Sequence, residues 1–359
     1  MKIKSIKLEG FRCHSLITID FGDNTNIIFG PNASGKTSII EAVYIFGLLK
    51  SPRGIADREL INNVNDHFYI EASFVSSTLN KYNVSVGFNG EQKIVRKNKS
   101  IVKRMSDHIG IIDCVWFSAN DLFLLSGSPQ NRRTNFDRIL CQISKVYFSA
   151  LSNYKKFLKE RNALLKRLIF ENRKENIILL ETINERLIFE GKRIINIRQK
   201  VIEKINEILL KKHSEIGYKN EALKIEYVPS VTEDMIEEKI ISNVDEDIKH
   251  GNTSFGPHKD DYIFIINNKN IVYQGSQGQQ RNAVLSLKLA EVELIYNVKK
   301  EYPILLLDDV FNELDLERQN RLLKGIEENV QTIITTTSIS GLDKEIIRNS
   351  NLIELKGED

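Results

Sequence analysis

A glycine-rich octapeptide constrains this chain of 359 residues more than any other feature. It follows a short apolar segment, residues 26–29, and precedes an apolar-rich segment, residues 38–49. Strand, loop and helix in this order are the context that a phosphate-binding loop requires. The pattern G-x-x-x-x-G-K-T is formed by Gly30, Pro31, Asn32, Ala33, Ser34, Gly35, Lys36 and Thr37. We therefore predict that the chain binds a nucleotide.

Each residue type in the loop has a chemical role. Glycines 30 and 35 allow backbone conformations that bring successive N–H groups onto one anion, and the helix adds its positive dipole end. Lys36 neutralises the β- and γ-phosphates, and the Thr37 hydroxyl takes one position on an octahedral Mg²⁺. Ser38 at the head of the helix completes the predicted phosphate-binding set. The expected cofactors are ATP and Mg²⁺.

Two acidic residues follow a buried strand far downstream. The segment 304–307 is wholly apolar and predicts a central strand, which Asp308 and Asp309 follow. Acids at a strand end are often solvated turn residues, but the phosphate-binding loop favours a metal role. We assign Asp308 to the Mg²⁺ shell and Asp309 to orienting or deprotonating the attacking water. Together with Lys36 they are the predicted catalytic residues.

A second glycine-rich segment, residues 275–279, precedes a helical run over 282–299. Ser276 and the amides around Gly278 present donors at a helix N-terminus, which suits a γ-phosphate. The alternative is a Gly/Ser turn that caps a helix, and the position just upstream of Asp308 favours the phosphate. Ser276, Gly278 and Gln279 therefore join the predicted nucleotide-binding residues.

At these residues the chain resembles the ATP-binding-cassette superfamily. Residues 275–279 match its signature loop, L-S-G-G-Q in the common form, at Ser, Gly and Gln, and residues 312–315 resemble its D-loop. The resemblance implies an ATP-dependent head-to-head homodimer in which each signature loop completes the nucleotide site of the other subunit. Thr335, Thr336 and Thr337 end the next strand, where a switch histidine is often found. This chain has no histidine there, and a hydroxyl could sense the γ-phosphate instead, with the replacing residue left open.

The more detailed resemblance is to the RecF family, bacterial recombination mediators related to the heads of SMC-type proteins. It covers both ends and the middle of the chain. Departures are Pro52 for the family's His, Ala119-Asn120 for Pro-Glu, and Lys259 for Arg. The matching segments are 4–12, the phosphate-binding loop, 51–53, 115–122, 127–133, 256–261, the signature loop and 307–315.

This resemblance implies the fold, the activity and the partners. The expected fold is α/β, a P-loop NTPase of ABC-ATPase type with a mixed-sheet head (lobe I) and a mainly helical second lobe (lobe II). Residues 1–118 and 300–359 are assigned to lobe I, and residues 119–299, with the signature loop, to lobe II. The implied activity is a weak, DNA-stimulated ATPase that acts as a switch on double-stranded and gapped DNA. RecR, with RecO and RecA, is the implied partner.

Local hydrophobic patterns indicate the elements. Strand spacing occurs over 3–8, 16–21, 69–75, 82–88, 223–228, 262–266 and 271–273, and helical spacing from 131 to about 212. A helix over 233–241 is also expected. Strands 304–307 and 332–336, joined by a helix over 316–330, are expected to run parallel beside the phosphate-loop strand.

Composition excludes other classes. With 41% hydrophobic and 28% charged residues the chain can build an ordinary globular core. No apolar run reaches the ~18 residues of a membrane span and no signal peptide is evident, so we expect a cytoplasmic protein without a membrane partner. Cys13, Cys114 and Cys141 are scattered, and we predict that they are buried apolar fillers.

Two basic runs stand out against a net charge of only +3. Such runs are usually solvated faces, and contact with a DNA backbone is the open alternative for both. The first run comprises Lys93, Arg96, Lys97, Lys99, Lys103 and Arg104, and the second comprises Lys155, Lys156, Lys159, Arg161, Lys166, Arg167, Arg173 and Lys174.

His258 lies beside two acids in the segment 256–261, but no second histidine stands at metal-ligand spacing. A structural turn before the strand 262–266 is the favoured interpretation. For the whole chain, the alternatives to a DNA-binding switch are a transporter ATPase subunit and an ATPase paired with a nuclease. The helical insertion and the basic runs disfavour the transporter, and no metal-dependent nuclease cluster is visible.

Overall fold

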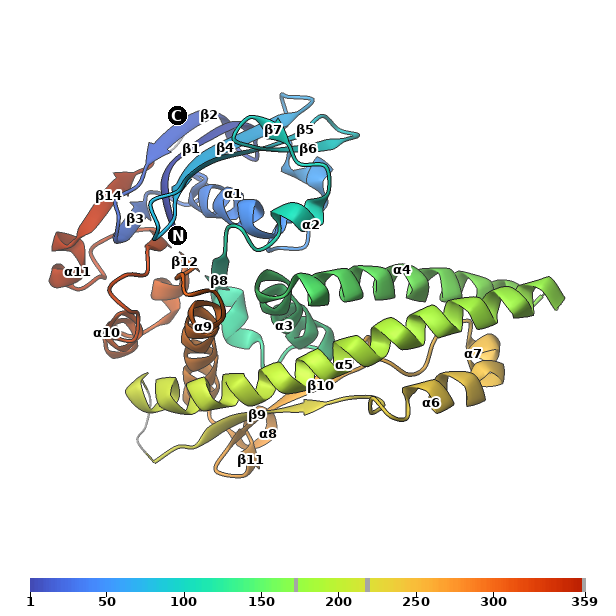
Figure 1. Ribbon diagram of the computed structural model, residues 1–359. Helices are drawn as coiled ribbons and strands as arrows, with labels where there is room; N and C mark the ends of the chain where they lie inside the picture. Colours follow the sequence, from blue (N-terminus) through green and yellow to red (C-terminus); the bar gives the residue numbers. More distant parts are fainter. Residues whose placement is uncertain (171–173, 217–219, 357–359) are drawn as a thin grey trace. The chain divides into compact units, whose positions relative to one another are not determined.

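The computed structural model describes residues 1–170, 174–216 and 220–356 (Figure 1). The chain divides into two compact units. The first unit comprises Met1–Leu124, Ile208–Glu221 and Gln277–Asp359, and the second comprises Leu125–Glu207 and Ala222–Ser276.

These boundaries differ from the predicted lobes. Helix α9 (Gln277–Lys299), which was assigned to lobe II, lies in the first unit, where it packs against β8 (Cys114–Ser118) and the 3₁₀ helix η2 (Ala119–Phe123). Most of its side chains are buried, including polar Asn282 and Ser286, so this helix is a core element of the head. The end of the long helix α5 (Lys174–Ile216) also belongs to the first unit.

Two sheets build the first unit. The antiparallel sheet has the order β2-β1-β4-β5-β6-β7, and the parallel sheet has the order β14-β3-β13-β12-β8. The strands of the antiparallel sheet are β1 (Lys2–Phe11), β2 (His14–Asp20), β4 (Phe68–Val75), β5 (Lys81–Phe88), β6 (Lys93–Lys97) and β7 (Ser100–Ile101). Those of the parallel sheet are β3 (Thr25–Phe29), β12 (Ile304–Asp308), β13 (Thr332–Thr336) and β14 (Ser350–Glu354), together with β8.

Helix α1 (Lys36–Leu48) contacts both sheets of this unit: β1 and β5 on one side, and β8, β12 and β13 on the other. Its apolar side chains are buried almost all round, because a helix between two sheets has no solvent face. The smaller helices of the unit are η1 (Asp57–Leu60), α2 (Met105–His108), η3 (Val310–Glu313), α10 (Leu316–Lys324) and α11 (Lys344–Arg348).

The second unit is mainly helical, with a three-stranded antiparallel sheet of order β11-β10-β9. Helices α4 and α5 run side by side as an elongated pair in Figure 1. The elements are α3 (Pro129–Ile143), α4 (Lys145–Leu168), α6 (Ile236–Ser242), α7 (Val244–His250), α8 (Ile271–Gln274), β9 (Leu223–Val228), β10 (Asp261–Ile266) and β11 (Lys269–Asn270), together with most of α5.

Two local predictions are wrong. Residues 271–273 form the helical turn α8, because the Asn270 side chain caps it by accepting from the Val272 N–H at 3.0 Å. The helix predicted over 316–330 ends earlier, since α10 stops at Lys324, where Gly325 closes its last turn. The predicted strand 223–228 and the parallel strands 304–307 and 332–336 are confirmed.

The segment 256–261 lies in a buried polar network of the second unit. Arg198 donates to the Pro257 carbonyl oxygen at 2.8 Å and to Asp260 at 2.9 Å. His258 bonds through Nδ1 to the Tyr154 hydroxyl at 2.8 Å and through Nε2 to the Thr253 carbonyl at 3.0 Å. Burial lowers the pKa of His258 to about 4. These contacts support the turn interpretation, since both ring nitrogens bond within the protein.

Among the helices that the structure describes, none combines the length and the apolarity needed to span a bilayer.

Candidate nucleotide-binding site

The phosphate-binding loop connects β3 to α1 at the carboxyl end of the parallel sheet. Gly30 and Gly35 have φ angles of 156° and 86°, which other residues rarely adopt. A Cβ atom on Gly35 would collide with the His14 ring and with the Cys13 sulfur. Lys36 is 5% exposed, and its ammonium donates to the carbonyl oxygens of Gly30 at 2.9 Å and Pro31 at 2.7 Å. The loop is therefore wrapped closely around its own lysine.

Asp308 meets the loop at the end of β12. The Thr37 hydroxyl donates to Asp308 Oδ1 at 2.7 Å, and the Thr335 hydroxyl donates to the same oxygen at 3.0 Å. Strand β13 lies between β3 and β12, so Asp308 reaches Thr37 across one intervening strand. Burial raises the pKa of Asp308, although the two hydroxyl donors act in the opposite direction.

Residues of this site fit a bound Mg²⁺–triphosphate. Thr37 and Asp308 bring a hydroxyl and a carboxylate into contact, the oxygen donors that Mg²⁺ prefers. The Ser34 hydroxyl is buried in the loop and has no hydrogen-bond partner among the described residues. A phosphate oxygen can supply the missing partner, because phosphates accept hydrogen bonds from hydroxyl groups.

Asp309 is held in a left-handed conformation with φ of 53°, so its carboxylate does not continue the strand direction. Its backbone N–H donates to the Thr335 hydroxyl at 3.0 Å, and the Asn312 amide donates to its Oδ1 at 3.3 Å. Burial raises the pKa of Asp309, and the positive charge of Lys36 opposes that rise. Thr335 therefore supports both acidic residues.

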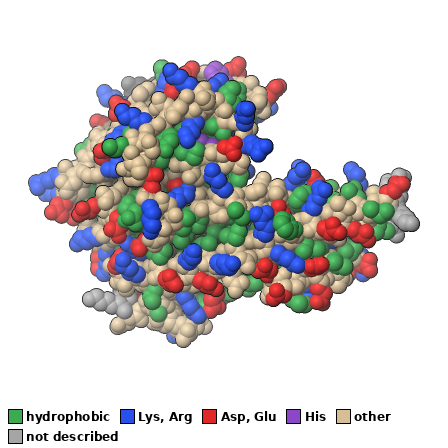
Figure 2. Space-filling view, in the orientation of Figure 1, with side chains coloured by type: hydrophobic (Ala, Val, Ile, Leu, Met, Phe, Trp, Pro, Cys, Tyr) green, Lys and Arg blue, Asp and Glu red, His purple; other side chains and the backbone are tan. Residues whose placement is uncertain are grey.

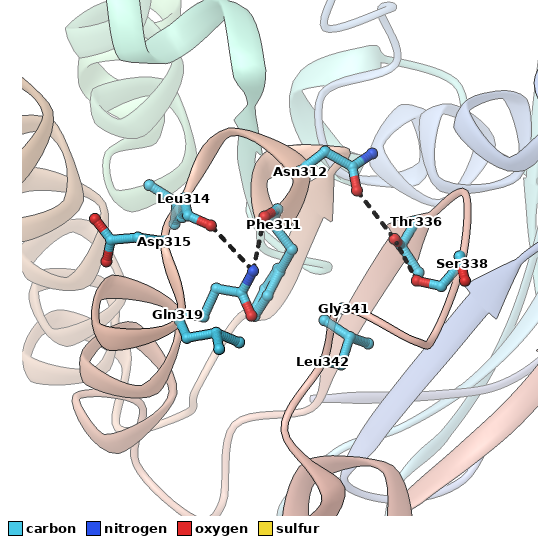
Figure 3. Close-up of a pocket in the computed structure, with 10 residues that line it drawn as sticks. Phe311, Asn312, Leu314, Asp315, Gln319, Thr336, Ser338, Gly341 and Leu342 are labelled. Carbon is cyan, nitrogen blue, oxygen red and sulfur yellow. Dashed lines mark hydrogen bonds between the residues drawn. The ribbon is translucent and has the colours of Figure 1, made fainter.

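The D-loop residues border a pocket of about 370 Å³ (Figure 3). Thr336 donates to the Asn312 side-chain oxygen at 3.2 Å, and so links β13 to the residue that contacts Asp309. Gln319 of α10 donates to the carbonyl oxygens of Phe311 at 2.9 Å and Leu314 at 3.1 Å. Hydrogen bonds from Gln319 and Thr336 thus hold the D-loop in place.

Sequence reasoning missed Glu41. This glutamate lies on α1, is fully buried, and accepts from Arg12 Nε at 3.0 Å and Nη2 at 3.2 Å. The Ser51 hydroxyl donates to the same carboxylate, and the Arg53 backbone N–H donates to the Ser51 oxygen. One signal was available, since Glu41 is the only charged residue in the apolar segment 38–49.

Cys13 also differs from the prediction. Cys114 and Cys141 are buried, but Cys13 is exposed beside the phosphate-binding loop, with its sulfur 3.9 Å from the Ser38 hydroxyl. A hydrogen bond to His14 is the largest cause that lowers the pKa of the Cys13 thiol. His14 in turn contacts the Gly35 carbonyl oxygen through Nε2 at 3.1 Å.

The signature segment spans the boundary of the two units. Ser276 is the last residue of the second unit, whereas Gly278 and Gln279 lie in the first turn of α9 in the first unit. The Gln279 amide donates to Glu221 Oε1 at 2.7 Å.

Only some residues of the two basic runs are exposed. In the first run, Lys93 pairs with Asp57 at 2.5 Å, while Lys99, Lys103 and Arg104 are exposed. In the second run, Arg161 is fully buried and pairs with Asp247 at 2.7 Å, which corrects its inclusion. Figure 2 shows Lys and Arg interspersed with Asp and Glu over α4 and α5. Arg173 and the Lys174 side chain lie outside the described residues.

The P-loop lies at the carboxyl end of a parallel sheet, and its threonine is hydrogen-bonded to Asp308. The signature segment begins a helix. These features define an ATPase of the ABC and SMC-head class. A family model described as an AAA ATPase domain matches residues 1–339. An SMC head bound to the C-terminal winged-helix domain of ScpA, 16% identical, covers 98% of this chain and 93% of its own with a TM-score of 0.55, which indicates the shared fold alone.

Relatives place the chain more narrowly. The DNA replication and repair protein RecF of Exiguobacterium sp. is 39% identical over 99% of this chain and 98% of its own length. RecF of Lachnospira eligens is 39% identical over 98% of this chain and 96% of its own length. A solved structure of the recombination mediator protein RecF with ATP, from the RecFOR pathway, is 32% identical, covers 95% of this chain and 93% of its own, and has a TM-score of 0.87. The chain belongs to the RecF family of DNA replication and repair proteins.

Proposed function

We propose that this protein is an ATP-dependent, DNA-binding recombination mediator whose switch is the site around Lys36. ATP binding closes a homodimer on double-stranded or gapped DNA, and a weak, DNA-stimulated hydrolysis releases it. The observation that carries this proposal is the contact of Thr37 with Asp308 at 2.7 Å, which joins the phosphate-binding loop to the carboxylate expected at Mg²⁺.

The residues of the site divide the work of hydrolysis. Bound Mg²⁺ shields the charge of the β- and γ-phosphates. The Lys36 ammonium binds the phosphate oxygens together with the backbone N–H groups of the loop from Gly30 to Ser38, other than Pro31, which has none. Thr37 and Asp308 would hold the metal. The Asp309 carboxylate, set by Asn312 and Thr335, orients the attacking water and accepts its proton.

Dimerisation follows from the division of the predicted nucleotide site. Ser276, Gly278 and Gln279 are assigned to the γ-phosphate of a second protomer, so each site is completed only in a closed dimer. Thr335 and Thr336 replace the switch histidine in this proposal, since they connect Asp308, Asp309 and Asn312. Turnover therefore sets how long the dimer stays closed.

The implied partners extend the proposal. Loading of RecA at gaps, with RecR and RecO, fits the named pathway of the relatives. Phosphate-backbone contacts from exposed lysines such as Lys99 and Lys156 would make DNA binding salt-dependent and largely independent of sequence.

Light scattering coupled to gel filtration tests the proposal. The protein is measured alone, with non-hydrolysable ATP, with duplex or gapped DNA, and with both. We expect monomers alone and DNA-retaining dimers with ATP and DNA, whereas a monomer under all four conditions would refute the switch. Ser276→Arg should remove the dimer and keep ATP binding by the monomer, since the signature loop acts in trans.

A further inference from the structure

The first turns of α9 are tied to the end of α5 by a buried chain of side chains in the first unit. Glu221 accepts from the Gln279 amide at 2.7 Å through Oε1 and lies 3.2 Å from His213 Nε2 through Oε2. His213 Nδ1 lies 2.8 Å from the Ser286 hydroxyl, two helical turns into α9. Glu221 and His213 thus contact α9 at Gln279 and Ser286, which lie on one face of the helix.

The side chains that connect α5 to α9 are largely shielded from water. His213 and Ser286 are fully buried, and the Glu221 side chain is 14% exposed. Burial also lowers the pKa of His213, which favours a neutral imidazole. Because a carboxylate can only accept, the His213 N–H on Nε2 is placed toward Glu221. The Ser286 hydroxyl donates to the Asn282 carbonyl oxygen at 2.7 Å and lies beside His213 Nδ1.

The same helical turns are also tied to the D-loop and to α10. Arg281 donates to the Glu313 carbonyl oxygen at 3.0 Å. The Arg318 Nε group donates to the Asn282 side-chain oxygen at 3.1 Å. The first turns of α9 are therefore held by Glu221, by the D-loop and by α10.

We propose that Glu221 is a positioning residue for the signature loop: by holding the Gln279 side chain, it fixes the orientation of the first turn of α9 toward the nucleotide of a second protomer. This role rests on the proposed function, in which Gly278 and Gln279 act in trans. Glu221 itself touches neither ATP nor metal in this assignment. Its loss should therefore lower turnover and leave the nucleotide affinity of the same subunit's P-loop unchanged.

Variants at Glu221 separate positioning from general damage. Glu221→Gln keeps an oxygen for the Gln279 amide and should retain kcat within about threefold of the parent, whereas Glu221→Ala loses that acceptor and should lower kcat roughly tenfold or more. The affinity of the monomer for a fluorescent ATP analogue should stay within about twofold for both. The matched control is Glu328→Ala, at an exposed acid of the same unit that forms no ion pair with the described residues.

Mixed dimers give the decisive measurement. Dimers of Glu221→Ala subunits and dimers of Lys36→Ala subunits are each defective. A mixed dimer, however, contains one site with an intact P-loop from one subunit and an intact signature loop from the other. Turnover should recover toward about a quarter of the parent value only in an equimolar mixture, because about half of the dimers are mixed and each mixed dimer has one intact site of two. A parallel mixture of Ser276→Arg with Lys36→Ala checks the trans site itself.

The outcomes are distinguishable. Recovery in both mixtures supports the positioning role of Glu221. Recovery with Ser276→Arg but not with Glu221→Ala overturns that role and leaves the proposed function standing. Absence of recovery in both refutes the trans site, and the role of Glu221 falls with it. An equal loss of kcat in Glu221→Gln and Glu221→Ala would also overturn it, because the retained acceptor would then have no effect.

Discussion

The Thr37 hydroxyl donates a hydrogen bond of 2.7 Å to Asp308 Oδ1, and so joins two motifs that are 271 positions apart in the chain. Thr335 donates to the same oxygen from the strand between them. The pair is positioned by parallel strands whose carboxyl ends share one sheet edge, and an Mg²⁺ coordinated by both groups would bridge the same two elements.

Replacing Thr37 tests the metal role of its hydroxyl. Thr37→Ser keeps the hydroxyl and should bind ATP with a normal dependence on Mg²⁺. Thr37→Val keeps the shape without the hydroxyl, and its ATP affinity should no longer rise when Mg²⁺ is added. Titration of a fluorescent ATP analogue with Mg²⁺ or with EDTA measures this difference. Equal metal dependence in both variants would remove Thr37 from the metal shell.

Asp309→Asn tests the hydrolytic role. The amide keeps an oxygen that Asn312 can donate to, but it cannot accept a proton from water. We expect ATP binding within about twofold of the parent and a loss of turnover of at least about a hundredfold. Phosphate release at saturating ATP is the measurement. Unchanged turnover would exclude Asp309 as the base.

The ionised Asp308 carboxylate should lower the stability of the folded protein at neutral pH. Burial raises its folded pKa above the ordinary value, so the ionised carboxylate is less favourable in the folded than in the unfolded chain. That destabilisation is present above the folded pKa and disappears as the pH falls below it. Asp308→Asn keeps an acceptor for Thr37 and Thr335 without the charge.

The melting temperature of Asp308→Asn should therefore exceed that of the parent by at least about 2 °C at pH 7.5, and the difference should shrink toward pH 4.5. Asp234→Asn, at an exposed acid, is the control and should show no such trend. A lower melting temperature at pH 7.5, or a difference that grows toward acid, contradicts the assigned sign.

The sequence predicted the parts of this fold that depend on local pattern. The phosphate-binding loop, the apolar strand before Asp308 and the strand 223–228 all carry short-range signals. The membership of α9 was not predictable in this way, because the pairing of a buried helix with a sheet depends on contacts distant in sequence. The turn α8 was missed because the capping effect of Asn270 prevailed over the β propensity of Ile271, Val272 and Tyr273.

Site residues followed the same rule. Thr37 and Asp308 belong to motifs and were predicted, whereas Glu41, Glu221 and His213 act through partners that only folding brings together. Arg161 illustrates the opposite error, since its place in a run of lysines indicated a surface residue. In the structure it is buried against Asp247, because one position of a helix in every three or four faces the core.

Arg161 should thus contribute stability, not DNA affinity. It donates to Asn184 at 2.7 Å, to Asp247 at 2.7 Å and to Thr253 at 2.8 Å. Arg161→Met leaves Asp247 buried without its counter-ion, which costs about 3–5 kcal/mol. We expect a marked fall in the urea midpoint, whereas the control Lys156→Met, at an exposed site on α4, should change stability by less than about 0.5 kcal/mol. Equal midpoints would contradict the buried pair.

Cys13 offers a chemical test of the same nucleotide site. Its thiol is exposed, and the hydrogen bond to His14 is the largest cause that lowers its pKa, so more thiolate is present at neutral pH than for an ordinary cysteine. N-ethylmaleimide should therefore modify Cys13 before the buried Cys114 and Cys141. Because the sulfur lies 3.9 Å from the Ser38 hydroxyl, the adduct should block ATP binding, and bound ATP should protect the thiol.

Mass spectrometry after partial alkylation identifies the first site, and a fluorescent ATP analogue reports the loss of binding. Cys13→Ser removes the reaction and should keep nucleotide affinity in the presence of the reagent. His14→Asn should shift the pH profile of alkylation toward higher pH, since the imidazole that lowers the thiol pKa is gone. Initial modification at Cys114 or Cys141 would contradict the predicted reactivity of Cys13. Alkylation at Cys13 that ATP does not slow would contradict its predicted place beside bound ATP.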